Sequence, residues 1–191
     1  RGLGDVYKRQ LQATTTGHDL IAIGCGALFS NTTAPDNIAV GYQSQYSTTT
    51  GHSNVSMGWQ SMVSNTTANN NVAIGFESLK ANTTGCHNVA IGHTALNDNT
   101  TANSNVAIGT ESLDVNTTGA DNTAVGTNSL GANTTAACNT AVGSSALGST
   151  TSGEDNTAVG YASLDANTTG ECNVAVGVMA LKTNTTAECN T

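Results

Sequence analysis

The sequence is poor in the residues that dominate most globular domains. Charged residues make up 9% of its 191 residues, aromatic residues 4%, and Pro35 is the only proline. Hydrophobic residues reach 37%, which is thin for one globular core of this length but sufficient for narrow stacked coils. No apolar run approaches the roughly 20 residues of a membrane span, and no basic stretch followed by an apolar one suggests a signal peptide.

Basic residues are scarce as well. Five Lys and Arg face thirteen Asp and Glu, which gives a net charge of −8. Three of the five basic residues fall within the first ten positions, so only Lys80 and Lys182 remain in the rest of the chain. Two lysines cannot neutralise a phosphate backbone. The composition therefore excludes nucleic acid as a partner.

A 17-residue repeat fills the chain from Leu11 onward. The unit begins at residues 20, 37, 54, 71, 88, 105, 122, 139, 156 and 173 without insertion or deletion, and residues 190–191 begin another. We number the places in the unit from its first residue, so Asn71 holds place one and His87 place seventeen. Place four is always aliphatic or Met, place five always Gly, and place eight always Ala or Ser. So short and strict a period describes the whole fold.

Each coil is expected to contain about two short strands and two turns. Side chains alternate along a strand, so we expect Val72 and Ile74 to face the core, Ala73 to face outward, and Leu79 at place nine to return to the core. Gly75 supplies a corner because Gly takes positive φ without steric cost. Places twelve to fifteen read Asn-Thr-Thr-Gly/Ala in most coils, which is turn chemistry.

One such coil cannot fold alone. Its two or three apolar side chains cannot offset the ordering of 17 residues, which costs roughly 1–2 kcal/mol each for the backbone. Stacking is the solution that solenoids use. We therefore predict an all-β parallel solenoid, or β-roll, about 48 Å long for ten coils. Helical repeats are disfavoured by the Gly corner and the Asn/Thr cluster of every coil, and disorder by the phased aliphatic place four.

Small residues also recur at places three and eight. Place three is Ala in nine coils and Ser56 in the other. We expect these residues on an outer face, where their small size would let another chain approach closely. A homotrimer would then pool the few apolar residues of each chain into a shared core.

The first ten residues carry no repeat signature. They resemble the peptide that results when sequencing-adapter DNA is translated at the edge of a metagenomic contig, so we interpret residues 1–10 as a non-native leader, with an authentic N-terminal arm as the alternative. Residues 11–191 then form a single array. Leu11 stands at place nine and Thr191 at place two, so we expect a fragment of a longer array, truncated at both ends.

The repeat resembles two known families. Asn-x-Ala-Ile/Val-Gly-x-x-Ala/Ser-Leu, as in Asn88 to Asn99, resembles the head repeat of trimeric autotransporter adhesins. The longer unit from Asn156 to Gly170 is similar to repeats of bacterial and phage tail-fibre-domain proteins. The resemblance covers Leu11 to Thr191, although adhesin head coils are usually a few residues shorter. It implies a left-handed, homotrimeric β-roll in an extracellular fibre, on a bacterial outer surface or a virion tail.

The cysteines offer one possible crosslink. Cys172 and Cys189 both occupy place seventeen, one coil apart, at a Cα separation near ~4.8 Å that falls within the disulfide range. Five cysteines is an odd number, and no Cys-x-x-Cys occurs. We favour free thiols, with a Cys172–Cys189 disulfide as the alternative.

Metal and catalytic sites find little support. His18 and His52 lie two coils apart, about 10 Å by strand spacing, which is too far for one zinc ion. Carboxylates at place seventeen could hold Ca²⁺ between coils. Only four coils carry one, at Asp19, Asp36, Asp121 and Asp155, so a solvated turn is favoured. No Ser/His/Asp or Cys/His set shares one face. We expect no metal, no cofactor and no catalysis.

Places twelve to fourteen also match the glycosylation sequon in eight coils. The asparagines are Asn31, Asn65, Asn82, Asn99, Asn116, Asn133, Asn167 and Asn184. In a bacterial or phage protein we expect instead that Asn and Thr stack as hydrogen-bonded ladders at a turn.

The sequence thus predicts a non-catalytic shaft or head of an extracellular adhesive fibre. Its partner would be an unknown protein or glycan receptor, contacted through the variable places six, seven, ten, eleven and sixteen. The alternative is an ice-binding solenoid that uses its Thr ladder, with Thr83, Thr100, Thr117 and their neighbours.

Overall fold

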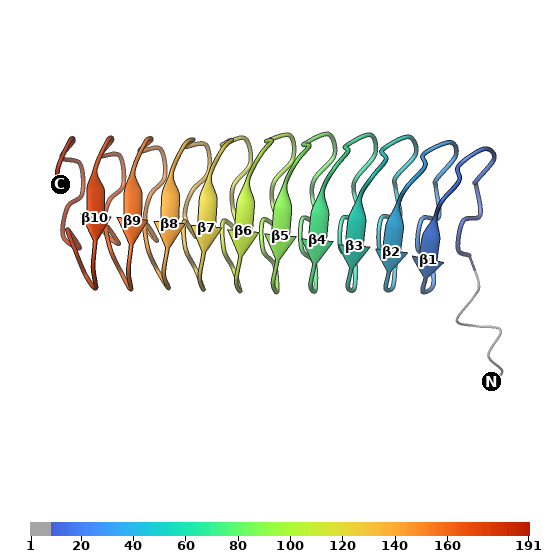
Figure 1. Ribbon diagram of the computed structural model, residues 1–191, viewed down its shortest axis with the longest axis horizontal. Coiled ribbons are helices and arrows are strands. Elements are labelled where there is room, and N and C mark those ends of the chain that lie inside the picture. The colour runs from blue at the N-terminus through green and yellow to red at the C-terminus, as the bar shows by residue number, and fades with distance from the viewer. Residues whose placement is uncertain (1–8) are drawn as a thin grey trace.

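A computed structural model describes residues 9–191, so most of the segment interpreted as a leader lies outside the described residues. Within residues 9–191, ten strands, all parallel, form one sheet in which spatial order follows chain order (Figure 1). The strands are β1 (Ile21–Ile23), β2 (Ile38–Val40), β3 (Val55–Met57), β4 (Val72–Ile74), β5 (Val89–Ile91), β6 (Val106–Ile108), β7 (Thr123–Val125), β8 (Thr140–Val142), β9 (Thr157–Val159) and β10 (Val174–Val176). The predicted all-β parallel solenoid of 17-residue coils is confirmed.

The register between coils is constant along the rod. Strand β4 pairs with β5 through Val72–Val89, Ala73–Ala90 and Ile74–Ile91, and every other pair joins the same places. Because no coil gains or loses a residue, each place lies directly beside its counterpart in the next coil. Ladders of equivalent side chains therefore run the length of the molecule.

Each coil contains one strand rather than the two predicted. Places six to eleven, where the second strand was expected, form turns. Leu79 within them adopts a left-handed backbone with φ of 51°, which breaks an extended run. Its backbone N–H still donates to the Ala95 carbonyl of the next coil at 3.0 Å. The turns are thus held between coils by the same kind of bond as a strand.

The two faces of the sheet are the reverse of the prediction. Ala73 is fully buried, whereas Val72 and Ile74 on either side of it are only partly buried. The interior is narrow and already holds the side chains of Ser78 and Leu79, both fully buried. Only a small residue fits at place three beside them. The predictions that places two and four fill the core, and that places three and eight form an outer face, are both wrong.

The leucines of place nine form the core as predicted. Leu79 and Leu96 belong to one continuous buried cluster with the alanines of place three. Gln45 replaces Leu in one coil, and its amide nitrogen donates to Ser56 Oγ and to the Ile38 carbonyl, both at 3.0 Å. Ser56 is the one residue at place three that is not Ala, so these two departures from the repeat bond to each other, while the buried Gln45 Oε1 has no partner within the described residues.

Two asparagine ladders flank this core. At place one, Asn88 Nδ2 donates to the Ala102 carbonyl at 2.9 Å, and Asn88 Oδ1 accepts the backbone N–H of Asn105 at 3.0 Å. At place twelve, Asn99 Nδ2 donates to Asn82 Oδ1 at 3.0 Å. The expected ladder at the turn is present, and the place-one ladder is a second one that the sequence did not reveal. Seven of the eight sequon asparagines, among them Asn82 and Asn99, are fully buried, so the folded coil leaves no room for a glycan there.

Candidate functional site

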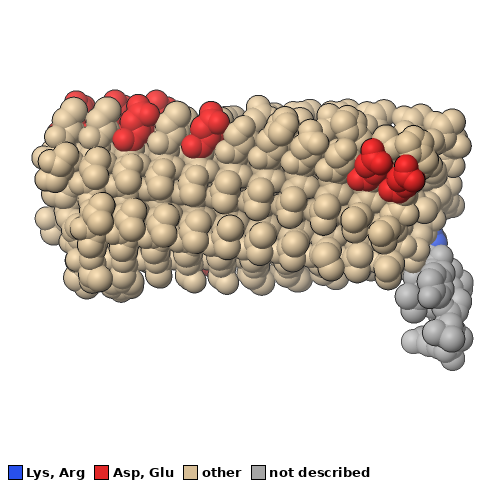
Figure 2. Space-filling view, viewed as in Figure 1, with Lys and Arg blue, Asp and Glu red and all other residues tan. Residues whose placement is uncertain are grey.

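The outward face of the sheet carries apolar side chains along its whole length. Places two and four of all ten strands point outward, and they are aliphatic, Met or Thr. Several of these side chains are well exposed: Ile21, Ile23, Met57, Ile108, Val142, Val174 and Val176. Figure 2 shows the middle of this face free of charged side chains, with the acidic residues in view lying in the upper part of the rod. The outward face is therefore an uncharged ladder of β-branched and aliphatic groups.

A stack of aromatic rings extends the outward face at place six. Ring centroids lie 5.9 Å apart for Tyr42–Trp59, 4.9 Å for Trp59–Phe76 and 5.1 Å for Phe76–His93, with planes within 15° of parallel. Tyr42, Trp59 and Phe76 are each between 41% and 44% exposed. Since the rings cover one another's faces, their edges meet the solvent. The signal was present in the sequence as four ring-bearing residues at one place in successive coils.

The threonine ladder differs from the one that ice binding was predicted to use. Thr83 Oγ1 donates to the Thr100 carbonyl at 3.0 Å, and Thr100 Oγ1 donates to the Thr117 carbonyl at 3.2 Å. These hydroxyl protons join one coil to the next. The row that remains free to face the solvent is place fourteen, exemplified by Thr84 and Thr101, both exposed.

The cysteines are free thiols in the structure, and three of them are exposed: Cys138, Cys172 and Cys189. Desolvation, the neighbouring Cys189 thiol and the carboxylates of Asp155 and Glu171 raise the pKa of Cys172 above its ordinary value. A raised pKa lowers the fraction of thiolate, which is the form that reacts and binds metals. This edge of the rod thus places the Cys172 thiol, with its raised pKa, beside carboxylates.

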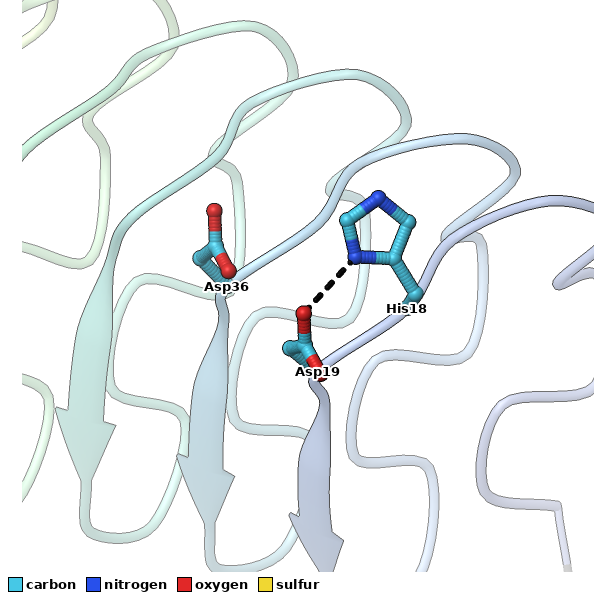
Figure 3. A group of neighbouring side chains, drawn as sticks. All are labelled: His18, Asp19 and Asp36. Atoms are coloured by element: carbon cyan, nitrogen blue, oxygen red, sulfur yellow. Dashed lines mark hydrogen bonds and ion pairs between the residues drawn. The ribbon is translucent and has the colours of Figure 1, made fainter.

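A second group of polar side chains lies at the coil edge just before β1 and β2. The imidazole Nδ1 of His18 lies 2.9 Å from Asp19 Oδ2, and Asp36 occupies the same place as Asp19 one coil further on (Figure 3). One ligand atom from each of the three residues lies within 4.8 Å of the others. Sequence spacing related His18 to His52 and the aspartates only to one another, so the convergence of His18, Asp19 and Asp36 was not predicted.

Residues 9–191 open no pocket, and they contain no helix with the length and hydrophobicity of a membrane span. The fold defines the class of the chain as a parallel β-solenoid repeat protein. Comparison with protein-family models, with curated proteins and with solved structures gave no match. The function is therefore argued from the surface of the rod.

Proposed function

We propose that this chain is the non-catalytic rod of an extracellular adhesive fibre, on a bacterial surface or a virion tail, that mediates attachment. The observation that carries the proposal is the outward face of the sheet, which is apolar over ten coils although it faces the solvent. Because every coil repeats the same buried residues, the residues that hold the rod together are distinct from the residues on its surface. The interior fixes the shape, while the variable places remain free to differ from coil to coil.

A homotrimer accounts for the outward face. Ten strands at about 4.8 Å, with places two to four spanning about 7 Å, give roughly 340 Å² per chain. That is within the range of the largest apolar patch on a typical monomer, and such patches mark interaction sites. Three chains that turn this face inward would form a shared core from places two and four. The resemblance to trimeric adhesins supports three copies rather than two.

The charge distribution is compatible with this assembly. The chain carries a net charge of −8, so copies would repel one another if their acidic residues met. In the view of Figure 2 the middle of the outward face is free of acidic side chains, and those in view lie in the upper part of the rod. Copies that meet through that face keep their charges in solvent.

The residues that contact the receptor would lie at the variable places of the repeat. Places six and sixteen are exposed or partly exposed in every coil, from Cys25 and Pro35 onward. They change identity from coil to coil while places one, five and nine hardly do. The receptor, a protein or a glycan, would therefore contact the variable side chains of a few neighbouring coils rather than the residues common to all coils.

Light scattering coupled to size-exclusion chromatography tests the assembly. The wild-type chain is expected to have the mass of a trimer, and the double variant Ile74→Lys, Ile91→Lys the mass of a folded monomer, because it places charges in the shared core. The matched control Thr84→Lys, Thr101→Lys puts the same charges on exposed place fourteen and should stay trimeric. A monomeric wild-type chain at concentrations where circular dichroism shows it folded would refute the homotrimer.

Attachment is measured separately, by binding of the fluorescently labelled chain to a glycan array and to bacterial and animal cells. Retention of the trimer on a subset of these surfaces, with loss when Trp59 and Phe76 are both changed to Thr, is the expected result if the aromatic stack belongs to the recognition surface. Failure to bind any surface would count against the adhesive role while leaving the trimer intact.

Ice binding is the second candidate. Place fourteen keeps a row of exposed threonines at coil spacing, and place two adds Thr123, Thr140 and Thr157 on the outward face of β7 to β9. The place-fourteen row is one residue wide, however, and the neighbouring place-thirteen hydroxyls donate within the rod. Thermal hysteresis of a concentrated solution decides: a freezing-point depression below the melting point supports ice binding, and its absence removes it.

A further inference from the structure

We infer that His18, Asp19 and Asp36 form a binding site for a divalent transition-metal ion of the Zn²⁺ class, which clamps two neighbouring coils at the edge of the rod. The three side chains come from two coils. His18 and Asp19 immediately precede β1, and Asp36 takes the same place before β2 (Figure 3). The convergence arises from the 17-residue register, which sets place seventeen of one coil beside place seventeen of the next.

The distances fit one ion. Zinc binds imidazole nitrogen and carboxylate oxygen at about 2.0–2.2 Å, usually with tetrahedral geometry, so two ligand atoms of one ion lie about 3.3–3.6 Å apart. The three ligand atoms here all lie within 4.8 Å of one another, and all three side chains are exposed. Side-chain rotation can therefore close the gap of up to about 1.5 Å around a bound ion. Water would complete the coordination.

The donor set selects the kind of ion. An imidazole together with two carboxylates suits Zn²⁺ and its transition-metal neighbours, whereas Ca²⁺ prefers oxygen ligands alone. In this respect the site differs from the acidic edge near Glu154 and Glu171, where carboxylates stack without an imidazole. The thiol of Cys172 on that edge is a poor competitor, because its pKa is raised.

The charges point to a cation as well. Asp19 and Asp36 are the one pair of carboxylates at place seventeen of adjacent coils. Like charges directly opposite each other on neighbouring strands are destabilising. Within residues 9–191, no Lys or Arg forms a salt bridge with either carboxylate, and Asp19 pairs with His18. A bound divalent cation would neutralise both carboxylates at once.

Isothermal titration calorimetry with ZnCl₂ tests the site on the full chain after its thiols have been alkylated with iodoacetamide. One Zn²⁺ per chain is expected, bound more tightly than Ca²⁺, with a higher Tm in the presence of Zn²⁺. His18→Ala, Asp19→Asn and Asp36→Asn should each weaken binding at least about tenfold, since even second-shell changes cost that much. Asn is chosen because it tolerates the left-handed backbone of both positions, with φ of 55° and 58°.

Two matched controls separate this site from general attraction of cations. His52→Ala removes a histidine from the same place as His18, and Asp121→Asn removes a carboxylate from the same place as Asp36. Both should bind Zn²⁺ as the wild type does. The inference is overturned by absence of Zn²⁺ binding, by affinities that are equal in site and control variants, or by Ca²⁺ binding as tightly as Zn²⁺. Circular dichroism without metal establishes that each variant is folded.

Discussion

The rings of Trp59 and Phe76 stack across adjacent coils, with centroids 4.9 Å apart and planes 6° from parallel. Each ring comes from the residue that follows the glycine corner, so the pair depends on two corners being superimposed. Tyr42 and His93 continue the stack on either side. The same side chains therefore hold coils together and shape the surface that a partner would meet.

Loss of a ring from this stack should weaken the rod. Phe76→Thr removes two stacked contacts, each worth about 0.5–1.5 kcal/mol beyond buried area, so it should destabilise by about 1–3 kcal/mol. Tyr161→Thr is the control, because Tyr161 stands at the same place between Ser144 and Val178. Thermal melting followed by circular dichroism measures both. Equal losses of stability would show that the stack contributes nothing.

Because place three faces the interior and place two faces outward, substitutions at these neighbouring places should affect stability differently. Ala90→Val adds two methyl groups inside the fully buried interior, which should cost about 1–3 kcal/mol through overpacking. Val89→Thr on the outward face copies the residue of β7 to β9 and should change the free energy of unfolding of the isolated chain by less than about 0.5 kcal/mol. Chemical denaturation compares them. The reverse order would restore the arrangement that the sequence pattern first suggested.

The place-one asparagine ladder should be essential to the stacking of the coils from Asn37 onward. Asn88→Ala leaves the buried Asn105 N–H without its acceptor, at about 1–3 kcal/mol, whereas the Ala102 carbonyl keeps a second donor in Asn99 Nδ2. Thr101→Ala is the surface control, since Thr101 is exposed and belongs to the place-fourteen row that faces the solvent. Hydrogen exchange at the neighbouring amides reports the local loss. An Asn88→Ala chain as protected as the control would contradict the assigned role.

Gly75 should tolerate no side chain. Its φ is 139°, and an added Cβ would collide with the backbone carbonyl of Gly92 in the next coil. Strained backbone alone costs of order 1–3 kcal/mol, and the collision adds to it, so Gly75→Ala should lower Tm strongly or prevent folding. Gly148→Ala is the comparison: the nearest atoms to its added Cβ are a movable Asp165 carboxylate oxygen and the Ser145 carbonyl. A small, equal effect of both changes would exclude the corner role.

Stability should depend on pH through Asp114. Burial and the nearby carboxylates of Asp98 and Glu111 raise the pKa of Asp114 above its ordinary value. The folded chain then holds this proton more tightly than the unfolded chain, so its contribution to stability falls as pH rises from below about 4 through the raised folded-state pKa. Asp114→Asn should therefore raise Tm at pH 7, and the gain should vanish near pH 3. A gain that is the same at both pH values would show that ionisation of Asp114 is not its cause.

The sequence by itself determined the architecture. A period of 17 without insertion requires identical coils in constant register, and a Gly at place five together with a Leu at place nine fixes a corner and a core residue in each coil. These features follow from local chemistry and from repetition, and the structure contains them at Gly75, Leu79 and the Asn82 turn. Place six also carried a readable signal, because four rings in successive coils must stack once the register is constant.

Only the tertiary structure decided which way the sheet faces. The alternation of side chains along a strand places Ala73 and Ile74 on opposite sides of the sheet, but it does not say which side is the interior. That depends on the space left inside the coil beside Ser78 and Leu79. The convergence of His18, Asp19 and Asp36 was hidden for a similar reason: adjacency across coils depends on how the turn before each strand directs its side chains. Both outcomes rest on the width of the coil and the path of its turns, which are properties of the closed coil rather than of any single stretch of residues.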